Sequence, residues 1–306
     1  MKRVISLASA LWLALGAAAS ASDEPYVGMA KPWQLGFQTP VTPVMEKLYG
    51  MHDFLLVIIA AITALVLALL VFISLRFHRR FNPVPSKTTH NTRLEVIWTA
   101  IPILILVVIA IPSLRLHYYM EEHVNPDLTV KVTGYQWYWH YDYPDSGGFG
   151  FDSYIKKDGD LKPGDIRQLA VDNSLVVPVD ATVRVLITGA DVIHSWAVPS
   201  FGIKRDAVPG RLNETWFKAE KIGTFYGQCS QLCGVGHGFM PISVQVVSKD
   251  DFNAWVKQQQ DKAGIKPAAQ TEMNKALTPE TNPTVPAAPA PAAPLAKPEA
   301  PAKNAT

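Results

Sequence analysis

The sequence has only two cysteines among its 306 residues, and both lie in its last third. No cysteine lies near the N-terminus, where an exported lipoprotein carries its lipid, so we expect no lipid anchor there. The two long apolar runs contain no histidine, so the chain offers no set of membrane histidines for binding haem. The net charge is only +2, which on its own indicates neither a basic nor an acidic partner.

Both cysteines lie in one short segment that is rich in metal-binding side chains. The segment 227–240, GQCSQLCGVGHGFM, contains Cys229, Cys233, His237 and Met240. Its glycines let the backbone fold back, so that several side chains can reach one point. Thiolate, imidazole and thioether groups favour copper over magnesium, calcium or manganese. A single-copper electron-transfer site uses one cysteine, so a second thiolate predicts that two coppers are bridged.

Two other interpretations of this segment stay open on the residues alone. Two cysteines in an exported chain can form a disulfide. A zinc site is also compatible with cysteine and histidine, although methionine is a poor zinc ligand. A second histidine is available at His194, in ITGADVIHSWAVPS, after a β-type run. The presence of His237, Met240 and His194 favours copper over both alternatives.

The N-terminal part of the chain predicts export and two membrane spans. Residues 1–21 have a basic start, an apolar run and small residues before a cut after Ala21, which is typical of a secretory signal. An exported segment, 22–53, precedes a span at 54–75, which is uncharged and long enough to cross a bilayer. A second span covers 94–116, where Pro102 and Pro112 should bend the helix or lie near its ends.

The loop between the spans determines the predicted orientation. Residues 76–93 carry five Lys or Arg residues and no acidic residue. The positive-inside rule places this loop in the cytoplasm. The N-terminus and the C-terminal domain then lie on the periplasmic side of a bacterial inner membrane.

Residues 127–255 contain short alternating β-type runs, which predict an antiparallel sandwich or barrel. In the aromatic run 134–143, GYQWYWHYDY, strand alternation would place Tyr135, Trp137, Trp139 and Tyr141 on one face. Residues 263–306 are rich in proline, alanine and lysine, cannot form a core, and are expected to be disordered.

These motifs together resemble subunit II of the haem–copper cytochrome c oxidases of bacterial type, over about residues 33–255. The resemblance implies a two-helix transmembrane hairpin followed by an all-β, cupredoxin-like Greek-key barrel. It also implies electron transfer from cytochrome c, through a dinuclear copper centre, to haem in a catalytic subunit I. That subunit would reduce oxygen to water and pump protons, so this chain would be one part of an enzyme.

The resemblance assigns roles to individual residues. The implied copper ligands are His194, Cys229, the backbone carbonyl of Gln231, Cys233, His237 and Met240. Trp137 matches the tryptophan through which the family accepts electrons, and Glu95 matches a glutamate at the cytoplasmic mouth of a proton pathway. Gln231 departs from the family, which has a glutamate there that reaches an interface magnesium. Because an amide binds a hard cation less strongly than a carboxylate, magnesium binding is doubtful here.

Charge predicts how cytochrome c would dock. Residues 121–250 carry 16 acidic and 12 basic side chains, a net charge of −4, which would steer a basic partner. Four aspartates match docking positions of the family, although each is also typical of a solvated turn: Asp142, Asp145, Asp172 and Asp191. In the segment 201–215, Lys204, Asp206 and Arg211 match positions that face the catalytic subunit.

Other classes of protein fit the sequence less well. A copper-binding assembly or delivery protein, the main alternative, would need neither the aromatic run nor the Glu95 segment. A quinol oxidase subunit II would lack the copper ligands, and nitrous oxide reductase carries its similar loop on a much longer soluble chain. The expected partners are cytochrome c, subunit I, other oxidase subunits and membrane lipid, with no nucleic acid.

Overall fold

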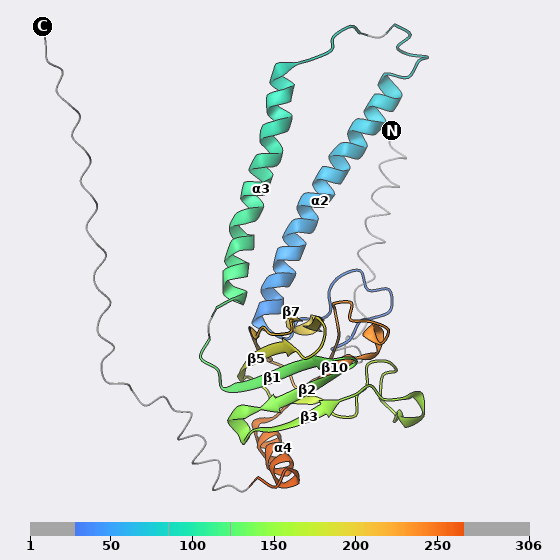
Figure 1. Cartoon of the computed structure of the whole chain (residues 1–306). Helices are drawn as coiled ribbons and strands as arrows, with labels where there is room; N and C mark the ends of the chain where they lie inside the picture. The colour runs from blue at the N-terminus through green and yellow to red at the C-terminus, as the bar shows by residue number, and fades with distance from the viewer. Residues whose placement is uncertain (1–27, 85, 123, 266–306) are drawn as a thin grey trace, which may run out of the picture. The chain divides into compact units, whose positions relative to one another are not determined.

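The computed structural model describes residues 28–84, 86–122 and 124–265. The predicted signal peptide and nearly all of the predicted tail lie outside these residues. Two long helices, α2 (Pro43–Arg76) and α3 (Thr92–Met120), precede a β-domain (Figure 1). Both helices are long and apolar enough to cross a membrane.

Helix α2 begins eleven residues before the span predicted from hydropathy, for a local reason. The hydroxyl of Thr42 accepts a hydrogen bond from the backbone N–H of Met45, 3.1 Å away, and Pro43 occupies the first helical turn. The same hydroxyl donates to the carbonyl of Phe201 in the β-domain. Val44 and Met45 are buried there, so the helix starts where it packs on the domain.

Helix α3 is capped by the side chain of Asn91, which accepts from the N–H of Leu94. Pro102 and Pro112 both lie inside the helix. Glu95 lies in the first turn of α3, at its N-terminal end, whereas the β-domain follows its C-terminal end.

Ten strands form the β-domain. They are β1 (Leu128–Tyr135), β2 (Tyr138–Tyr143), β3 (Phe149–Ser153), β4 (Leu175–Pro178), β5 (Thr182–Gly189), β6 (His194–Val198), β7 (Ile203–Ala207), β8 (Asn213–Lys218), β9 (Gly223–Gln228) and β10 (Pro241–Val247). They make three sheets, in the orders β3-β2-β1-β5-β8, β4-β10-β9 and β6-β7. The antiparallel arrangement expected from the sequence holds for most strand pairs, but β1 pairs with β5, and β4 with β10, in parallel.

The core lies between the sheets and is rich in aromatic residues. Trp139 and Tyr141 on β2 are fully buried. Tyr143, at the end of β2, donates its hydroxyl hydrogen bond to the carbonyl of Val176 on β4 and accepts one from the N–H of Val176. This pair of hydrogen bonds joins the two larger sheets.

The predicted side-chain alternation along 134–143 holds only in part. Trp139 and Tyr141 share the buried face, but a tight turn at Gln136 and Trp137 separates β1 from β2. Tyr135 therefore stacks on Tyr138, with ring centroids 4.8 Å apart, instead of joining Trp139. The turn also turns Trp137 away from the strand, toward the cysteine segment.

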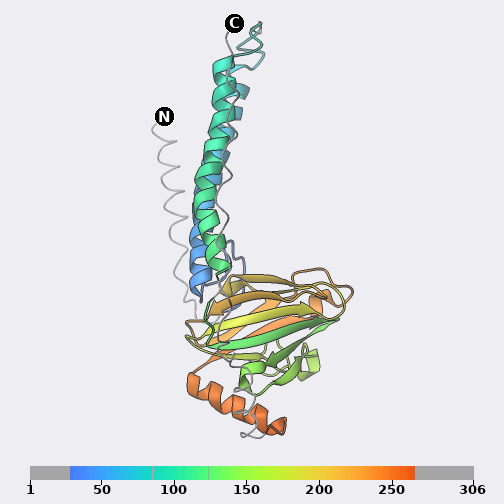
Figure 2. The same ribbon diagram turned by 60° about the vertical axis from the view of Figure 1, so that its left-hand side comes forward.

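One helix was not expected from the sequence. Helix α4 (Lys249–Lys262) follows β10, and Figure 2 shows it packed along one end of the β-domain. The ring of Trp255 on α4 lies 5.2 Å from that of Tyr143 and 5.6 Å from that of Phe149. The predicted domain end at residue 255 falls inside this helix.

Candidate metal centre

The loop between β9 and β10 carries most of the predicted ligands. Cys229 directly follows β9, and Met240 directly precedes β10. Because β9 and β10 pair antiparallel, with Gln228 opposite Pro241, the two ends of the loop meet. The N–H of Ser230 donates to the carbonyl of Ser195 on β6, which ties the loop to the strand that begins with His194.

The two cysteines lie close together but are not bonded. Their Sγ atoms are 3.8 Å apart and both side chains are buried. A disulfide needs about 2.05 Å, so the disulfide interpretation does not describe this structure. Metal–thiolate bonds are about 2.3 Å long, so both sulfurs can reach the same ion.

The remaining donors divide between the two sulfurs. Sγ of Cys233 lies 3.5 Å from Nδ1 of His237 and 3.5 Å from Sδ of Met240. Sγ of Cys229 lies 4.0 Å from Nδ1 of His194 and 3.3 Å from the carbonyl oxygen of Gln231. Each thiol thus has its own imidazole nitrogen and its own weak donor.

This donor set fits copper better than zinc. A structural zinc site is closed by four ligands in a tetrahedron, whereas six donors converge here. The weak donors are a thioether and a carbonyl, which suit a copper site with axial ligands. The structure therefore brings all six predicted ligands together around the two sulfurs, with His194, Cys229, Cys233 and Met240 buried, His237 half-buried and Gln231 exposed. This donor set is consistent with a copper site.

Asp191 orients the buried imidazole of His194. Its Oδ1 lies 2.9 Å from Nε2 of His194, which leaves Nδ1 facing the cysteines. The same carboxylate accepts hydrogen bonds from the backbone N–H groups of Val192 and Gln136. A side chain at Gly134 would press on the ring of His194, so the close approach of β1 requires glycine there.

These contacts set the protonation of the pair. Burial alone would raise the pKa of Asp191. The hydrogen bonds that its carboxylate accepts from His194, Val192 and Gln136 outweigh burial and lower that pKa. Burial disfavours the imidazolium of His194, yet Cys229 and Asp191 together raise its pKa. A carboxylate behind a ligand histidine fixes the tautomer and makes the imidazole a better donor.

The two thiols differ in acidity. Burial resists ionisation of Cys229, but hydrogen bonds from His194 and the backbone lower its pKa to about 6. Burial and the neighbouring Cys229 raise the pKa of Cys233 to about 12. Without metal, Cys229 therefore loses its proton more readily than Cys233.

Trp137 lies against the metal loop. Its indole Nε1–H donates to the carbonyl of Cys233 at 3.0 Å, and Nε2 of Gln136 donates to the same oxygen at 2.8 Å. A Cβ at Gly236 would overlap the indole ring, so only glycine lets the loop pass this close. The indole is half-buried, and its other side remains open to solvent.

The four predicted docking aspartates do not form one compact patch. Asp145 accepts from the N–H of Thr129, six residues from Tyr135, so it lies about 20 Å from the Trp137 end of β1. Asp142 contacts His140 and Lys131 on the open face of β2. Asp172 accepts from the N–H of Tyr154, whose ring stacks on Tyr138 beside Trp137.

A separate hollow brings together residues expected to face a catalytic subunit. It has a volume of 590 Å³, and its lining includes Lys204, Asp206, Arg211 and Gln231. Glu121, at the C-terminal cap of α3, also lines it and binds Arg205 of β7 through two 2.7 Å contacts. Among the described residues, the cluster of histidine, cysteine and acidic side chains that could hold a metal ion is the one at His194, Cys229 and Cys233, and it does not include Gln231. Doubtful magnesium binding at Gln231 therefore stays a prediction.

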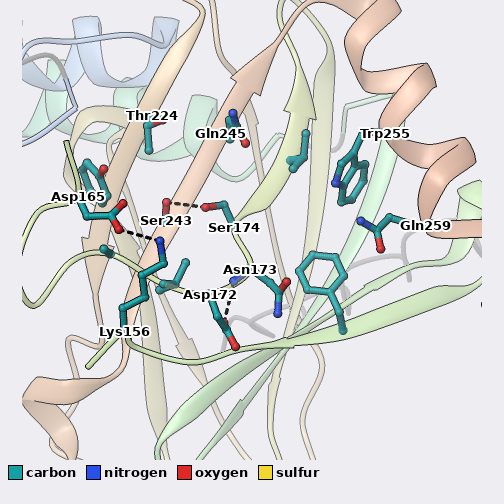
Figure 3. Close-up of a pocket in the computed structure, with 15 residues that line it drawn as sticks. Lys156, Asp165, Asp172, Asn173, Ser174, Thr224, Ser243, Gln245, Trp255 and Gln259 are labelled. Carbon is teal, nitrogen blue, oxygen red and sulfur yellow. Dashed lines mark hydrogen bonds and ion pairs between the residues drawn. The ribbon is translucent and has the colours of Figure 1, made fainter. Parts of the chain in front are cut away.

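Another cavity, of 360 Å³, is unrelated to this centre. Figure 3 shows it between the outer face of β9 and β10, the segment 154–174 and α4. Its polar groups bind one another: Lys156 pairs with Asp165 at 2.8 Å, and Ser174 with Ser243 at 2.9 Å. No copper-cluster residue lines it.

The sequence analysis did not predict the roles of three residues at the centre. Gln136 holds the Cys233 carbonyl, and Trp139 donates from Nε1 to the carbonyl of Met240. Asp191 was assigned to docking alone, although it contacts a ligand. Its position three residues before His194 was the available signal.

Comparisons with known proteins agree with this architecture. Residues 128–247 match the family described as "Cytochrome C oxidase subunit II, periplasmic domain", and residues 30–116 match "Cytochrome C oxidase subunit II, transmembrane domain". The "Probable cytochrome c oxidase subunit 2" of Rickettsia bellii is 55% identical over 256 residues, which cover 84% of this chain and 92% of that protein.

Two solved structures contain a similar domain. The periplasmic domain of subunit II of cytochrome oxidase (CoxB) from Bradyrhizobium japonicum is 57% identical, covering 45% of this chain and 97% of that one, with a TM-score of 0.43. A mixed disulfide intermediate between the thioredoxin-like protein TlpAs and subunit II of cytochrome c oxidase contains a domain 53% identical, covering 46% and 96%, with a TM-score of 0.42.

The expected fold class is thus confirmed: two apolar helices followed by a cupredoxin-like periplasmic domain. The protein is a membrane protein with two spans and belongs to a haem–copper oxidase complex. With this fold and this cluster of cysteine, histidine and methionine, the chain belongs to the cytochrome c oxidase subunit II family.

Proposed function

We propose that the chain accepts electrons from cytochrome c at a dinuclear copper centre and passes them to haem in the catalytic subunit. Oxygen reduction and proton pumping take place in that subunit. One observation carries the proposal: two buried thiols lie 3.8 Å apart, each flanked by its own imidazole and its own weak donor. This arrangement offers equivalent positions for two ions.

Six donors of the chain would hold the two copper ions. They are Cys229, Cys233, His194, His237, Met240 and the Gln231 carbonyl, since each thiol lies beside one imidazole and one weak donor. When bound, copper supplies reversible one-electron chemistry. The protein contributes rigidity, because the ligands are held by paired strands and by Asp191, and burial of His194 keeps water out.

Trp137 is the residue through which we propose that electrons arrive. Its indole joins the exposed surface to the Cys233 carbonyl by one hydrogen bond. Asp172, which bonds to Tyr154 near Tyr138, together with Asp142 would steer a basic cytochrome c toward it. Asp145 supports this steering less, because it lies at the opposite end of β1.

The other proposed contacts concern the rest of the oxidase. Glu95, in the first turn of α3, would lie at the cytoplasmic mouth of a proton pathway in a bacterial inner membrane. The hollow around Gln231 and Asp206 would face subunit I. The amide of Gln231 supplies no charge there, so a magnesium ion would bind weakly unless another chain provides a carboxylate.

Copper loading would require both cysteines to be reduced, and an oxidising compartment favours their disulfide. A thioredoxin-like reductant would therefore be a further partner. Oxidised chain should take up copper only after such a protein reduces it, whereas copper uptake without reduction would remove this step.

Copper stoichiometry and electron paramagnetic resonance test the main proposal. The reduced, purified full chain should bind two coppers that share one unpaired electron. A Cys229→Ser variant should lose this shared signal, while Asp145→Asn serves as a control that leaves it unchanged. A single labile cuprous ion without a visible band would instead support the copper-delivery alternative.

A further inference from the structure

A groove between α2 and α3 is apolar along its floor and cationic at its rim. It has a volume of 570 Å³. Gly50, Met51 and Phe54 line it from α2, at spacings that place them on one face of the helix. Pro112, Leu116 and Tyr119 line it from α3, at spacings of four and three residues that also place them on one helix face. The two faces therefore lie opposite each other where the helices approach the β-domain (Figure 1).

The groove crosses the level at which the membrane surface is expected. Phe54 and Pro112 lie inside the predicted spans, at hydrocarbon depth. Lys47 lies seven residues before Phe54, about 10 Å farther along the helix axis, which corresponds to the headgroup layer. Arg115 lies at the edge of its span, and its long side chain can extend toward the same layer.

Two cations line this groove. The ammonium of Lys47 lies 4.8 Å from the centroid of the Tyr119 ring. In the described part of the chain, no ion pair joins Lys47 or Arg115 to a carboxylate. Both side chains are exposed, whereas Met51, Phe54 and Leu116 are half-buried. An arginine and a lysine together suit a phosphate, which arginine binds through two parallel hydrogen bonds.

We propose that this groove binds one anionic phospholipid of the periplasmic leaflet. Its phosphate lies between Lys47 and Arg115, and the upper part of one acyl chain lies along Met51, Phe54 and Leu116. A zwitterionic lipid would carry a positive group to the same two cations and bind less well. The bound lipid would fill the space between the helices just below the β-domain.

Gly50 allows a test that changes no charge. A Cβ at Gly50 would meet no atom within 4 Å, so a larger side chain starts in open space and leucine is expected to extend into the groove. Leucine is also a better helix former than glycine, so the variant should fold. The second variant is Lys47→Gln/Arg115→Gln, and Arg79→Gln/Arg80→Gln is a control with equal charge loss in the opposite loop.

The probe is a photoreactive phosphatidylglycerol, compared with phosphatidylcholine carrying the same reactive acyl chain, in nanodiscs that hold the whole oxidase. We expect cross-links in 43–54 and 112–120 that favour phosphatidylglycerol roughly tenfold. Gly50→Leu should lose these cross-links, the double glutamine variant should lose the headgroup preference, and the control should keep both.

Three results would overturn the proposal. Equal labelling by the two wild-type probes would mean ordinary annular lipid. Unchanged labelling in Gly50→Leu would mean that the lipid lies outside the groove. Wild-type oxidase in which these segments are unlabelled, while another subunit cross-links to them, would show that a protein helix fills the groove.

Discussion

Replacing Asp191 with alanine should weaken copper binding without removing any copper ligand. The change deletes the 2.9 Å contact to Nε2 of His194 and the acceptor of two backbone N–H groups. His194 is fully buried, so its Nε2 cannot exchange the lost partner for bulk water. The ring would then turn more freely, and the backbone at Gln136, next to Trp137, would lose an anchor.

The size of this effect follows from the contact. Losing the partner of a metal-bound histidine typically weakens metal affinity by about 10–100-fold, or about 1.4–2.7 kcal/mol. An opposing effect exists, because removing the carboxylate also lowers the pKa of His194 and reduces proton competition. Measuring slightly above neutral pH removes most of that competition. Asp191→Asn keeps one oxygen acceptor, so its loss of copper affinity should lie near the lower end of this range, at about 10-fold.

Competition with a cuprous chelator measures the affinity directly. Asp145→Ala is the matched control, because it removes an aspartate that accepts a backbone hydrogen bond about 20 Å away. Unfolding of each metal-free variant must be followed as well, since lost hydrogen bonds alone cost about 1–3 kcal/mol. Equal affinity in Asp191→Ala and wild type, within twofold, would refute the positioning role.

Four further outcomes are expected. Trp137→Phe should keep its copper, because Gln136 still holds the Cys233 carbonyl, but should slow electron transfer from cytochrome c in stopped-flow, because phenylalanine cannot make the indole hydrogen bond to that carbonyl; an unchanged rate would contradict the entry role. Ultraviolet titration of metal-free protein should show one thiolate forming with an apparent pKa near 6 and the second well above 9; a joint transition near 9 would contradict the hydrogen bonding at Cys229. Asp142→Asn/Asp172→Asn should flatten the salt dependence of cytochrome c association while Asp145→Asn does not, and a wild-type rate at every ionic strength would exclude steering. Glu95→Ala should slow proton-coupled reduction of the catalytic centre with unchanged copper content, and normal turnover would remove Glu95 from the mechanism.

Local patterns predicted the elements that depend on neighbours in the sequence. The two apolar runs are long enough to cross a membrane, and the β-type runs at 174–189 and 242–247 correspond to β4, β5 and β10. Sequence patterns did not predict the features that depend on contacts between distant parts of the chain. Helix α2 starts at Pro43 because Thr42 caps it at the N–H of Met45 and also bonds to the carbonyl of Phe201, and hydropathy does not record a contact so far away in the sequence.

The sequence by itself determined the chemistry of the centre. Soft ligands at positions 229, 233, 237 and 240, with His194 upstream, already favoured copper over zinc, because ligand type is a property of side chains. The tertiary structure alone decided how those ligands are shared. Pairing of β9 with β10, and of the metal loop with β6, sets the sulfur separation and gives each thiol one imidazole. It also made Asp191 a support for His194 and turned Trp137 onto the metal loop, because both contacts join segments that lie on different strands and turns.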